Sequence, residues 1–436
     1  MDLYTRLFEE GAPSNKTIGR AYIQIPFCRS VCSFCWYAGR YDKLYRLNDR
    51  DCLPLQSAYV KALQREIAMR SQMGQEKPNV ALKVIHFGGG TPSTLDARHL
   101  IELLNSVKSA YCEGGSTPEI ITVETTPYEL DRNKFQALKT AGFNRISIGV
   151  QSFNEKNLSH FNRSGSLSGF GDKFGELRDL GFDNINFDML YGHPVQALEH
   201  IETDITKLLA YSPDHVDTYL WKPPQRGLPD EKIKQNLDQL CPQKRFDAFR
   251  IIRGILMDKG YMHYCGQLFC KLGKENIGHL MTINYALPFI SFGAGAFQYK
   301  YETTTKDIEE YIHMDFNPDF YTVPEETDGK KAGAFIQLIR AQLLLSQGLS
   351  LPWFNQRTDT DLLDLINKST SATFINREFN GVKIKCRTEF IQITEKYNFL
   401  KRLNRWLSDG DIEKQDSYLK ITEKGWNSKE LFTVLF

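Results

Sequence analysis

The sequence predicts an α/β protein built as a partial (β/α)6 barrel of the TIM type, followed by a helical, winged-helix-like domain. Between residues 21 and about 220, runs of β-branched and apolar residues alternate with amphipathic stretches of helical period. This alternation is typical of βα units and a parallel sheet. Six such units favour an open, incomplete barrel over a closed barrel of eight strands.

The apolar runs and the helical patterns alternate along the first half of the chain. The expected strands are Ala21 to Pro26, Leu82 to Phe87, Glu119 to Glu124, Arg145 to Val150, Asp183 to Leu190 and His215 to Leu220. The expected helices between them are Ser57 to Ser71, Asp96 to Ala110, Asp131 to Thr140, Gly169 to Leu180 and Ala197 to Ala210. Several of these helices open with an Asp or a Ser, which can accept hydrogen bonds from the first backbone N–H groups.

The pattern changes after the sixth strand. The segment KPPQRGLPD, from Lys222 to Asp230, indicates a loop that leaves the barrel, and Pro242 to Lys259 indicates one more helix. Residues 261 to 300 suggest irregular structure with a strand, and from about residue 330 helices precede a short hairpin. We expect an N-terminal segment at 1–20, the barrel with a substrate-side extension at 21–325, and a winged-helix-like cap domain at 326–436 that covers the barrel mouth.

The charge balance disfavours polyanionic partners. The chain has 54 Lys and Arg against 53 Asp and Glu, a formal net charge of +1. Neither nucleic acid nor stable membrane insertion is therefore expected. The opening MDLYTRLFEE lacks the basic and apolar regions of a signal peptide, and the nine cysteines are sparse and odd in number. These features favour a reducing, cytoplasmic location.

Three cysteines gather in one short loop, and this is the strongest functional signal in the chain. Cys28, Cys32 and Cys35 follow the first expected strand in YIQIPFCRSVCSFCWY, with the spacing C-x3-C-x2-C. Three thiolates cannot complete a tetrahedral zinc site without a remote fourth ligand. They can bind three irons of a [4Fe-4S] cluster and leave the fourth iron open to another ligand. An open metal position indicates a catalytic centre.

Further motifs fall where the expected strands end. These motifs are FGGGTPS (Phe87 to Ser93), VETTP (Val123 to Pro127), RISIGVQSF (Arg145 to Phe153), HFNRS around Arg163, and NFDMLYGHP (Asn186 to Pro194). In βα folds the carboxyl ends of the strands are where chemistry collects. One polar side chain there can be a helix cap or a solvated loop residue. One on each successive strand favours a shared site.

Together these motifs resemble the radical S-adenosylmethionine (SAM) superfamily, in the branch related to oxygen-independent coproporphyrinogen III oxidase. The resemblance covers roughly residues 20 to 300 and is weaker in the C-terminal domain. It implies that Cys28, Cys32 and Cys35 are catalytic metal ligands. It also implies that their cluster, reduced by a donor such as flavodoxin or ferredoxin, cleaves SAM to methionine and a 5′-deoxyadenosyl radical.

The resemblance also implies cofactor contacts. Gly88, Gly89, Gly90 and Thr91 would contact the methionine end of SAM. Glu124, Gln151 and Arg163 would face the cofactor, and Asp188 would lie near its ribose. Tyr22 and Phe34 would pack on the cluster or the cofactor.

This branch contains several activities, and the sequence departs from two of them. The coproporphyrinogen oxidase has a fourth cysteine where this chain has Tyr37. The haem chaperone has a His-Asn…Tyr-Trp signature, whereas this chain offers His279, Asn284 and Tyr285 without the His-Asn pair or the Trp. His279 remains a candidate haem ligand.

A Gly-rich run favours a third activity. PFISFGAGAFQ (Pro288 to Gln298) resembles the GAGA-type run of class C radical methyltransferases. We therefore expect methyl or methylene transfer to an sp2 carbon of a conjugated substrate, either a natural product or a tetrapyrrole, with two SAM molecules bound at once. The alternatives are a haem-binding chaperone and an oxidoreductase of porphyrin metabolism that resembles coproporphyrinogen III oxidase.

Other residues are weaker candidates. The aromatic residues that could grip a flat substrate are Trp36, Tyr37, Tyr191, Tyr219, Trp221 and Phe297. Cys265 and Cys270 are expected to be ordinary buried thiols.

Overall fold

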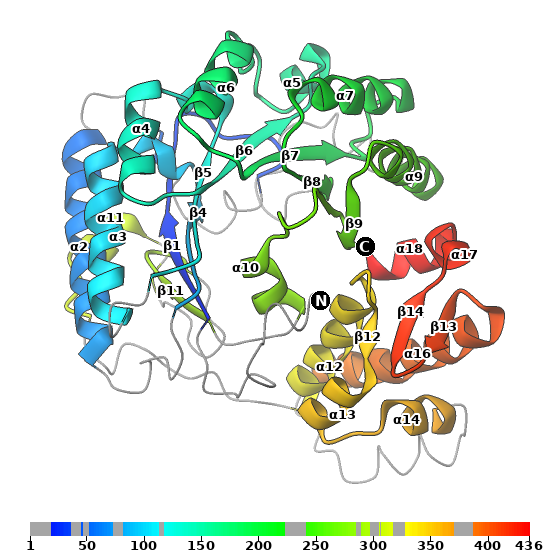
Figure 1. Ribbon diagram of the computed structural model, residues 1–436. Helices are drawn as coiled ribbons and strands as arrows, with labels where there is room; N and C mark the ends of the chain where they lie inside the picture. Colours follow the sequence, from blue (N-terminus) through cyan, green and yellow to red (C-terminus); the bar gives the residue numbers. More distant parts are fainter. Residues whose placement is uncertain are drawn as a thin grey trace.

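The computed structural model describes a barrel and a C-terminal helical segment (Figure 1). The described residues are 19–35, 45–46, 52–72, 82–112, 117–222, 241–284, 289–296, 305, 307–316, 328–369 and 387–436.

A nine-stranded sheet forms the barrel wall, in the order β11-β1-β4-β5-β6-β7-β8-β10-β9. Its central strands are β1 (Arg20–Ile25), β4 (Val84–Gly89), β5 (Ile120–Thr125), β6 (Arg145–Gln151), β7 (Ile185–Tyr191) and β8 (His215–Leu220). Each of these strands runs parallel to the next. The two edges of the sheet are β11 and β9, so the structure confirms the expected partial barrel.

The edges hold strands that the βα pattern does not predict. The strand β11 (Phe289–Phe292) pairs in parallel with β1, and it is the start of the Gly-rich run. At the other edge, β10 (Leu268–Cys270) pairs antiparallel with β8 and with β9 (Met262–Cys265). These strands have three or four residues each, too few for a clear alternation of period two.

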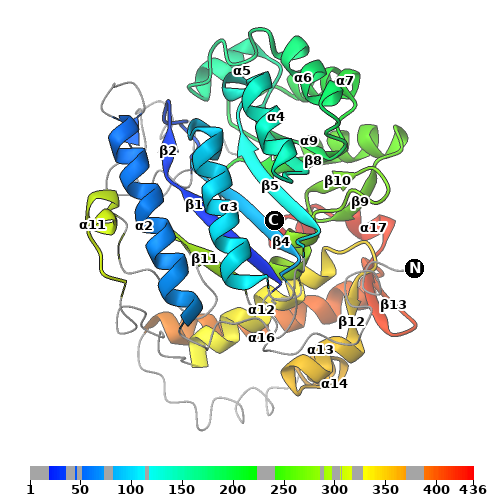
Figure 2. The ribbon, with the colours of Figure 1, turned by 60° about the vertical axis from the view of Figure 1, so that its left-hand side comes forward.

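Helices cover the outer face of the sheet, and α2 and α3 lie side by side along it (Figure 2). The helices of the barrel are α2 (Cys52–Gln72), α3 (Ala97–Tyr111), α4 (Arg132–Thr140), α5 (Glu155–His160), α6 (Phe170–Asp179), α7 (Leu198–Tyr211) and α9 (Pro242–Asp258). Shorter elements are β2 (Phe27–Cys28), β3 (Tyr45–Arg46), the 3-10 turns η2 (Pro92–Thr94) and η4 (Pro127–Glu129), α10 (Ile277–His279), the π-helical turn η5 (Leu280–Asn284) and α11 (Ile308–Ile312).

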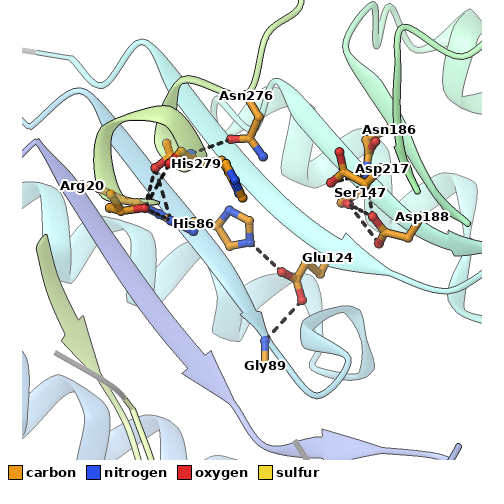
Figure 3. A network of polar contacts seen from close by, with 12 residues as sticks. Arg20, His86, Gly89, Glu124, Ser147, Asn186, Asp188, Asp217, Asn276 and His279 are labelled. Carbon is orange, nitrogen blue, oxygen red and sulfur yellow. Dashed lines mark hydrogen bonds and ion pairs between the residues drawn. The ribbon is translucent and has the colours of Figure 1, made fainter. Parts of the chain in front are cut away.

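Alternate residues of each strand face opposite sides of the sheet, and the two sides differ in chemistry. Ile23, Phe87, Val123, Ile148 and Phe187 are fully buried in the apolar core of the barrel. Their neighbours on the other side are polar, and several of them appear in Figure 3. The barrel therefore has an apolar layer under its helices and a polar interior.

The C-terminal segment contains helices followed by a hairpin, as expected for a winged-helix-like unit. Its elements are α12 (Asp328–Leu343), β12 (Leu349–Ser350), α13 (Leu351–Thr358), α14 (Leu362–Lys368), α16 (Arg387–Asp409), β13 (Ile412–Gln415), β14 (Tyr418–Ile421), α17 (Glu423–Trp426) and α18 (Lys429–Leu435). A three-stranded sheet joins β12, β14 and β13 in that order.

This segment packs at the opposite end of the barrel from the mouth, which differs from the expected cap. Ile339 and Leu343 of α12 share a hydrophobic core with Val84 and Ile120, the first residues of β4 and β5, and with Leu280 of η5. The first residues of parallel strands lie away from the carboxyl ends where the site residues gather. The apolar stripe of α12 is buried there, so it is not available to cover the mouth.

Among the helices in the described ranges, none is both long enough and apolar enough to cross a membrane.

Candidate active site

A cavity of about 560 Å³ lies at the carboxyl ends of the parallel strands. Most residues singled out from the sequence line it: Cys28, Cys32, Phe34, Cys35, Gly89, Gly90, Thr91, Glu124, Gln151, Arg163 and Asp188. Tyr22 and Gly88 lie beside Glu124, because a Cβ on Gly88 would overlap Tyr22 Oη and lie 2.6 Å from Glu124 Oε1. The fold therefore brings the expected site residues together.

The cysteine loop is held against the end of α5. Ser33 N donates to Phe161 O (3.3 Å), and Ser33 Oγ donates to His160 O (2.7 Å). Asn162 Nδ2 donates to Val31 O (2.7 Å). The chain between β6 and α6 therefore fixes the position of the loop.

The three cysteines are free thiols that face the cavity. Burial raises the pKa of Cys28 to about 12; the neighbouring Cys35 and Cys32 add to this rise, and a hydrogen bond with Thr91 opposes it. Such a thiol ionises readily only when a cation compensates its charge, as metal binding does.

The guanidinium group of Arg163 lies beside the sulfur of Cys32. Arg163 Nε donates to Cys32 Sγ (2.9 Å), and Arg163 Nη1 donates to Gly149 O (3.3 Å). Among the residues that the structure describes, no three His, Cys, Asp or Glu side chains converge on a position for a single metal ion. A four-iron cluster does not need that convergence, because each thiolate binds a different iron. The donor set fits a [4Fe-4S] cluster.

The glycines after β4 are required by close packing as well as by the cavity. Gly90 N donates to Ile25 O (2.8 Å), and a Cβ on Gly90 would lie 2.7 Å from Phe27 O. Gly89 has a φ of +108°, and a Cβ there would overlap Gln24 Nε2. Only glycine lets this segment lie against β1 and the start of the cysteine loop.

Glu124 is held by two donors at the end of β5 (Figure 3). Its Oε1 lies 2.7 Å from His86 Nε2, and its Oε2 accepts from Gly89 N (3.2 Å). Burial lowers the pKa of His86 despite the bond to Glu124, so the imidazole is neutral. Its proton is assigned to Nε2, since a carboxylate can only accept. His86 also stacks on Tyr22, with ring centroids 5.1 Å apart.

Backbone strain marks the end of β6. Gln151 has a φ of +71°, and the register with β7 shifts between Gly149 and Gln151. A non-glycine residue in this region costs free energy and is frequent at functional sites. The irregularity places Gln151 on the cavity wall.

Asp188 on β7 joins the cavity to the polar interior. Its carboxylate accepts from Asn186 Nδ2 (2.8 Å) and Ser147 Oγ (3.2 Å), and Asn186 Nδ2 also lies 3.3 Å from Asp217 Oδ2. Burial and the carboxylates of Asp217 and Glu124 raise the pKa of Asp188 well above its usual range.

The sequence motifs do not single out the second layer of this site, which consists of His86, Ser147, Asn186, His215 and Asp217. His86 and Asn186 each lie two residues before a predicted site residue on the same strand, Gly88 and Asp188, and therefore on the same face, whereas Ser147 lies four residues before Gln151 on β6. This period was available in the sequence. His215 and Asp217 lie on β8, where the sequence shows no predicted site residue.

Among the described residues, none of the aromatic side chains expected to grip a flat substrate lines the cavity. Tyr191 and Trp221 are 1% exposed and do not line the cavity. Trp221 packs with Phe161 and Leu190 behind Phe34, so it supports the cysteine loop. Tyr219 is 46% exposed. Trp36, Tyr37 and Phe297 lie outside the described residues.

Other candidates are buried. Cys265 and Cys270 are 3% and 0% exposed, and burial raises the pKa of Cys270. His279 lies in the barrel interior (Figure 3), and burial lowers its pKa to about 4. Asn284 falls in η5, and Tyr285 lies outside the described residues.

Residues 22–208 match the model of the radical SAM superfamily. With the cysteine loop at the carboxyl end of a partial barrel, this match shows that the chain contains a radical SAM domain. Radical SAM enzymes require a [4Fe-4S] cluster, SAM, a reductant and a small-molecule substrate.

The curated relatives narrow the class to the branch that contains HemW and HemN. The heme chaperone HemW of Bacillus subtilis is 28% identical over 295 residues, 67% of this chain and 74% of that protein. An oxygen-independent coproporphyrinogen III oxidase of Paracoccus denitrificans is 32% identical over 254 residues, 55% of this chain and 51% of the relative.

A solved structure has the same fold. Coproporphyrinogen III oxidase (HemN) of Escherichia coli superposes with a TM-score of 0.70 at 18% identity, over 97% of this chain and 90% of that one.

Proposed function

We propose that the protein is a radical SAM oxidoreductase that acts on a carboxylate-bearing tetrapyrrole. The observation that carries this proposal is the cavity that gathers three free thiols with Glu124 and Asp188 from β5 and β7. The names of the relatives supply the substrate class, since they include coproporphyrinogen III oxidases and heme chaperones.

The thiols of Cys28, Cys32 and Cys35 would hold the cluster. When bound, the reduced cluster supplies the electron that cleaves SAM to methionine and a radical able to remove hydrogen from the substrate. Arg163 stabilises negative charge at the Cys32 sulfur, to which its Nε donates at 2.9 Å.

The polar side chains of the cavity would orient SAM. Glu124 is an acceptor fixed by His86 and Gly89, which suits the ammonium group of the methionine end. Gln151 and Asp188 stand on the neighbouring strand ends and offer further hydrogen bonds. Holding the reacting groups at a fixed geometry is what a cavity of this kind contributes to the rate.

Methyl transfer with two SAM molecules is the expectation from the Gly-rich run. That run forms β11 and a turn beside β1, where Gly293 N donates to Glu66 Oε2 (2.8 Å) and Ala294 N donates to Tyr59 Oη (3.0 Å). These backbone groups serve the packing of the barrel. The relatives favour porphyrin oxidation or haem binding over methyl transfer.

Anaerobic reconstitution with iron, sulfide and a chemical reductant tests the proposal. With SAM, the protein should release 5′-deoxyadenosine, and with coproporphyrinogen III the product should have lost carbon dioxide and hydrogen. Cys32→Ala should abolish both products, whereas Cys265→Ala, a buried cysteine outside the cavity, should retain them. Failure of every tetrapyrrole tested to stimulate turnover would reject the substrate class.

Haem binding is the second candidate, favoured by a HemW relative that matches 67% of this chain. It predicts stoichiometric haem uptake with a Soret band and no consumption of SAM. His279 faces the interior near Asp217, Arg20 and His215, so a haem bound there would have to displace α10. A Soret band unchanged in His279→Ala would assign haem to another site.

A further inference from the structure

The rim of the cavity carries an aromatic side chain that the sequence motifs do not single out. Of the described aromatic residues, Phe34 and Tyr128 line the cavity. The ring of Phe34 packs edge to face on Phe161, with ring centroids 5.6 Å apart. Tyr128 is 62% exposed, so its ring offers apolar contact area to a ligand.

The backbone around Tyr128 is held against the barrel. Tyr128 lies in η4, the turn that follows β5, and Glu129 N closes this turn by donating to Thr126 O (3.0 Å). Lys173 Nζ on α6 donates to Pro127 O (3.5 Å). These bonds fix the place of the turn at the rim.

Arg29 lies beside the Tyr128 ring and directly follows Cys28 in the cysteine loop. The Cζ of Arg29 lies over the ring, 5.8 Å from its centroid. Arg29 Nε and Nη2 donate to the two carboxylate oxygens of Glu129, whose side chain is 4% exposed. This buried carboxylate fixes the orientation of the guanidinium group, because the two bonds are parallel.

The guanidinium group of Arg29 has donors left for a second carboxylate. A guanidinium carries five N–H donors in a planar fork. Glu129 occupies the edge formed by Nε and Nη2, and within the described ranges Nη1 makes no hydrogen bond. The side chain of Arg29 is 54% exposed and lines the cavity, so a ligand can reach the edge formed by Nη1 and Nη2. That edge suits a carboxylate, which it can bind through two hydrogen bonds.

The size of the cavity favours this rim as the place of a large substrate. Its volume of about 560 Å³ is typical of a site for one small molecule. A cluster and SAM bound at the thiols would take up much of this space. Most of a tetrapyrrole would therefore lie at the exposed rim, where Tyr128 and Arg29 stand.

We propose that Tyr128 and Arg29 form the substrate-recognition site of this cavity. The Tyr128 ring stacks on a pyrrole ring of the substrate, and the unused edge of Arg29 binds a carboxylate of the same molecule. Glu129 is a positioning residue that acts through Arg29. The identity of the ligand as a tetrapyrrole rests on the proposed function.

Binding of coproporphyrin III, a stable tetrapyrrole that bears carboxylates, tests the inference without turnover. Its fluorescence, titrated with the reconstituted protein in the presence of SAM, gives a Kd. Tyr128→Ala should raise this Kd about three- to tenfold because stacking is lost, whereas Tyr128→Phe should retain the affinity. Arg29→Gln should raise it about two- to fivefold, as expected for an ion pair at an exposed site, and should make it less dependent on salt. Arg29→Lys keeps the charge and should recover part of the affinity.

The tetramethyl ester of coproporphyrin III separates recognition of the carboxylate from a structural role of Arg29. The ester keeps the ring but has no free carboxylate, so Tyr128→Ala should weaken its binding and Arg29→Gln should not. Tyr219→Ala and Arg98→Gln are the matched controls. Tyr219 is 46% exposed, the side chain of Arg98 is 73% exposed, and neither lines the cavity, so both variants should leave the Kd unchanged.

Three results would overturn the inference: an unchanged Kd in Tyr128→Ala, equal weakening of acid and ester binding by Arg29→Gln, or no binding by the unaltered protein. If Arg29→Gln does not assemble its cluster, Tyr128→Ala and Arg29→Lys decide the question. Binding with the expected pattern but without tetrapyrrole turnover would instead reject the proposed function alone.

Discussion

His86→Phe is expected to weaken SAM binding about tenfold through Glu124. The substitution removes the donor that lies 2.7 Å from Glu124 Oε1 but keeps a ring that can stack on Tyr22. A hydrogen bond to a charged group contributes about 1.5 to 3 kcal/mol. The Glu124 side chain is 30% exposed, so water replaces part of the lost bond and the lower value applies. A loss of about 1.4 kcal/mol corresponds to a tenfold rise in Kd.

Equilibrium dialysis with labelled SAM on the reconstituted protein measures this Kd directly. His86→Gln keeps an amide donor and should recover part of the affinity. His99→Phe is the matched control, because His99 is buried on α3 and does not line the cavity. An unchanged Kd in His86→Phe, with an intact circular dichroism spectrum, would refute the role of His86.

Three further results follow from the geometry. Gly90→Ala should lower the free energy of unfolding by about 1 to 3 kcal/mol, because the new Cβ would lie 2.7 Å from Phe27 O. Gly254→Ala in α9 is the control and should not lower this free energy, because a Cβ there has nothing within 4 Å. Urea unfolding measures both variants. Burial lowers the pKa of His263 to about 4. The neutral imidazole therefore stabilises the folded protein above pH 6.5, and this stabilisation is lost as the pH falls from 6.5 toward 4. The urea midpoint of unfolding should decline over this range, and it should decline less in His263→Gln. Arg163→Ala should make the cluster harder to reduce, because a positive charge at 2.9 Å from a cysteine sulfur is lost, whereas Arg163→Lys should retain most of the potential; an EPR-monitored redox titration measures this.

Each of these expectations has a contrary result. Equal stability of the Gly90 and Gly254 variants would show that the segment after β4 can move away from the cysteine loop. The same pH dependence in His263→Gln and the unaltered protein would show that another group dominates the acid loss. An unchanged potential in Arg163→Ala would show that the guanidinium is not close to the cluster when iron is bound.

The central barrel could be predicted because its signals are local. On β6, for example, Ile146, Ile148 and Val150 place an apolar residue at every second position, and these residues pack under the helices. The site residues were also predictable, because they follow the strand ends within a few positions. Parallel strands then bring those ends to one edge.

The remaining features depend on contacts between distant segments. The strand β11 is recognisable only by its pairing with β1, more than 260 residues earlier in the chain. The hydrogen bond between Asn186 on β7 and Asp217 on β8 joins two side chains on the same face of the sheet, and no sequence motif indicates that they share this face. Periodicity shows that α12 has an apolar side, but not that this side packs on Val84 and Ile120.

The glycine motif shows how one pattern can serve two purposes. A ligand-binding role predicts that Gly88, Gly89 and Gly90 leave room for a cofactor. The structure adds that side chains at these positions would overlap Tyr22, Gln24 and the backbone of Phe27. Sequence alone cannot separate these two roles, because both require the absence of a Cβ.

EPR spectroscopy of the anaerobically reconstituted and reduced protein is the most direct test of the account. If Cys28, Cys32 and Cys35 hold a four-iron cluster with one open iron, the reduced protein should show the signal of a [4Fe-4S]+ cluster. Addition of SAM should shift that signal. Zinc in place of iron, or a cluster signal that SAM leaves unchanged, would contradict the assignment.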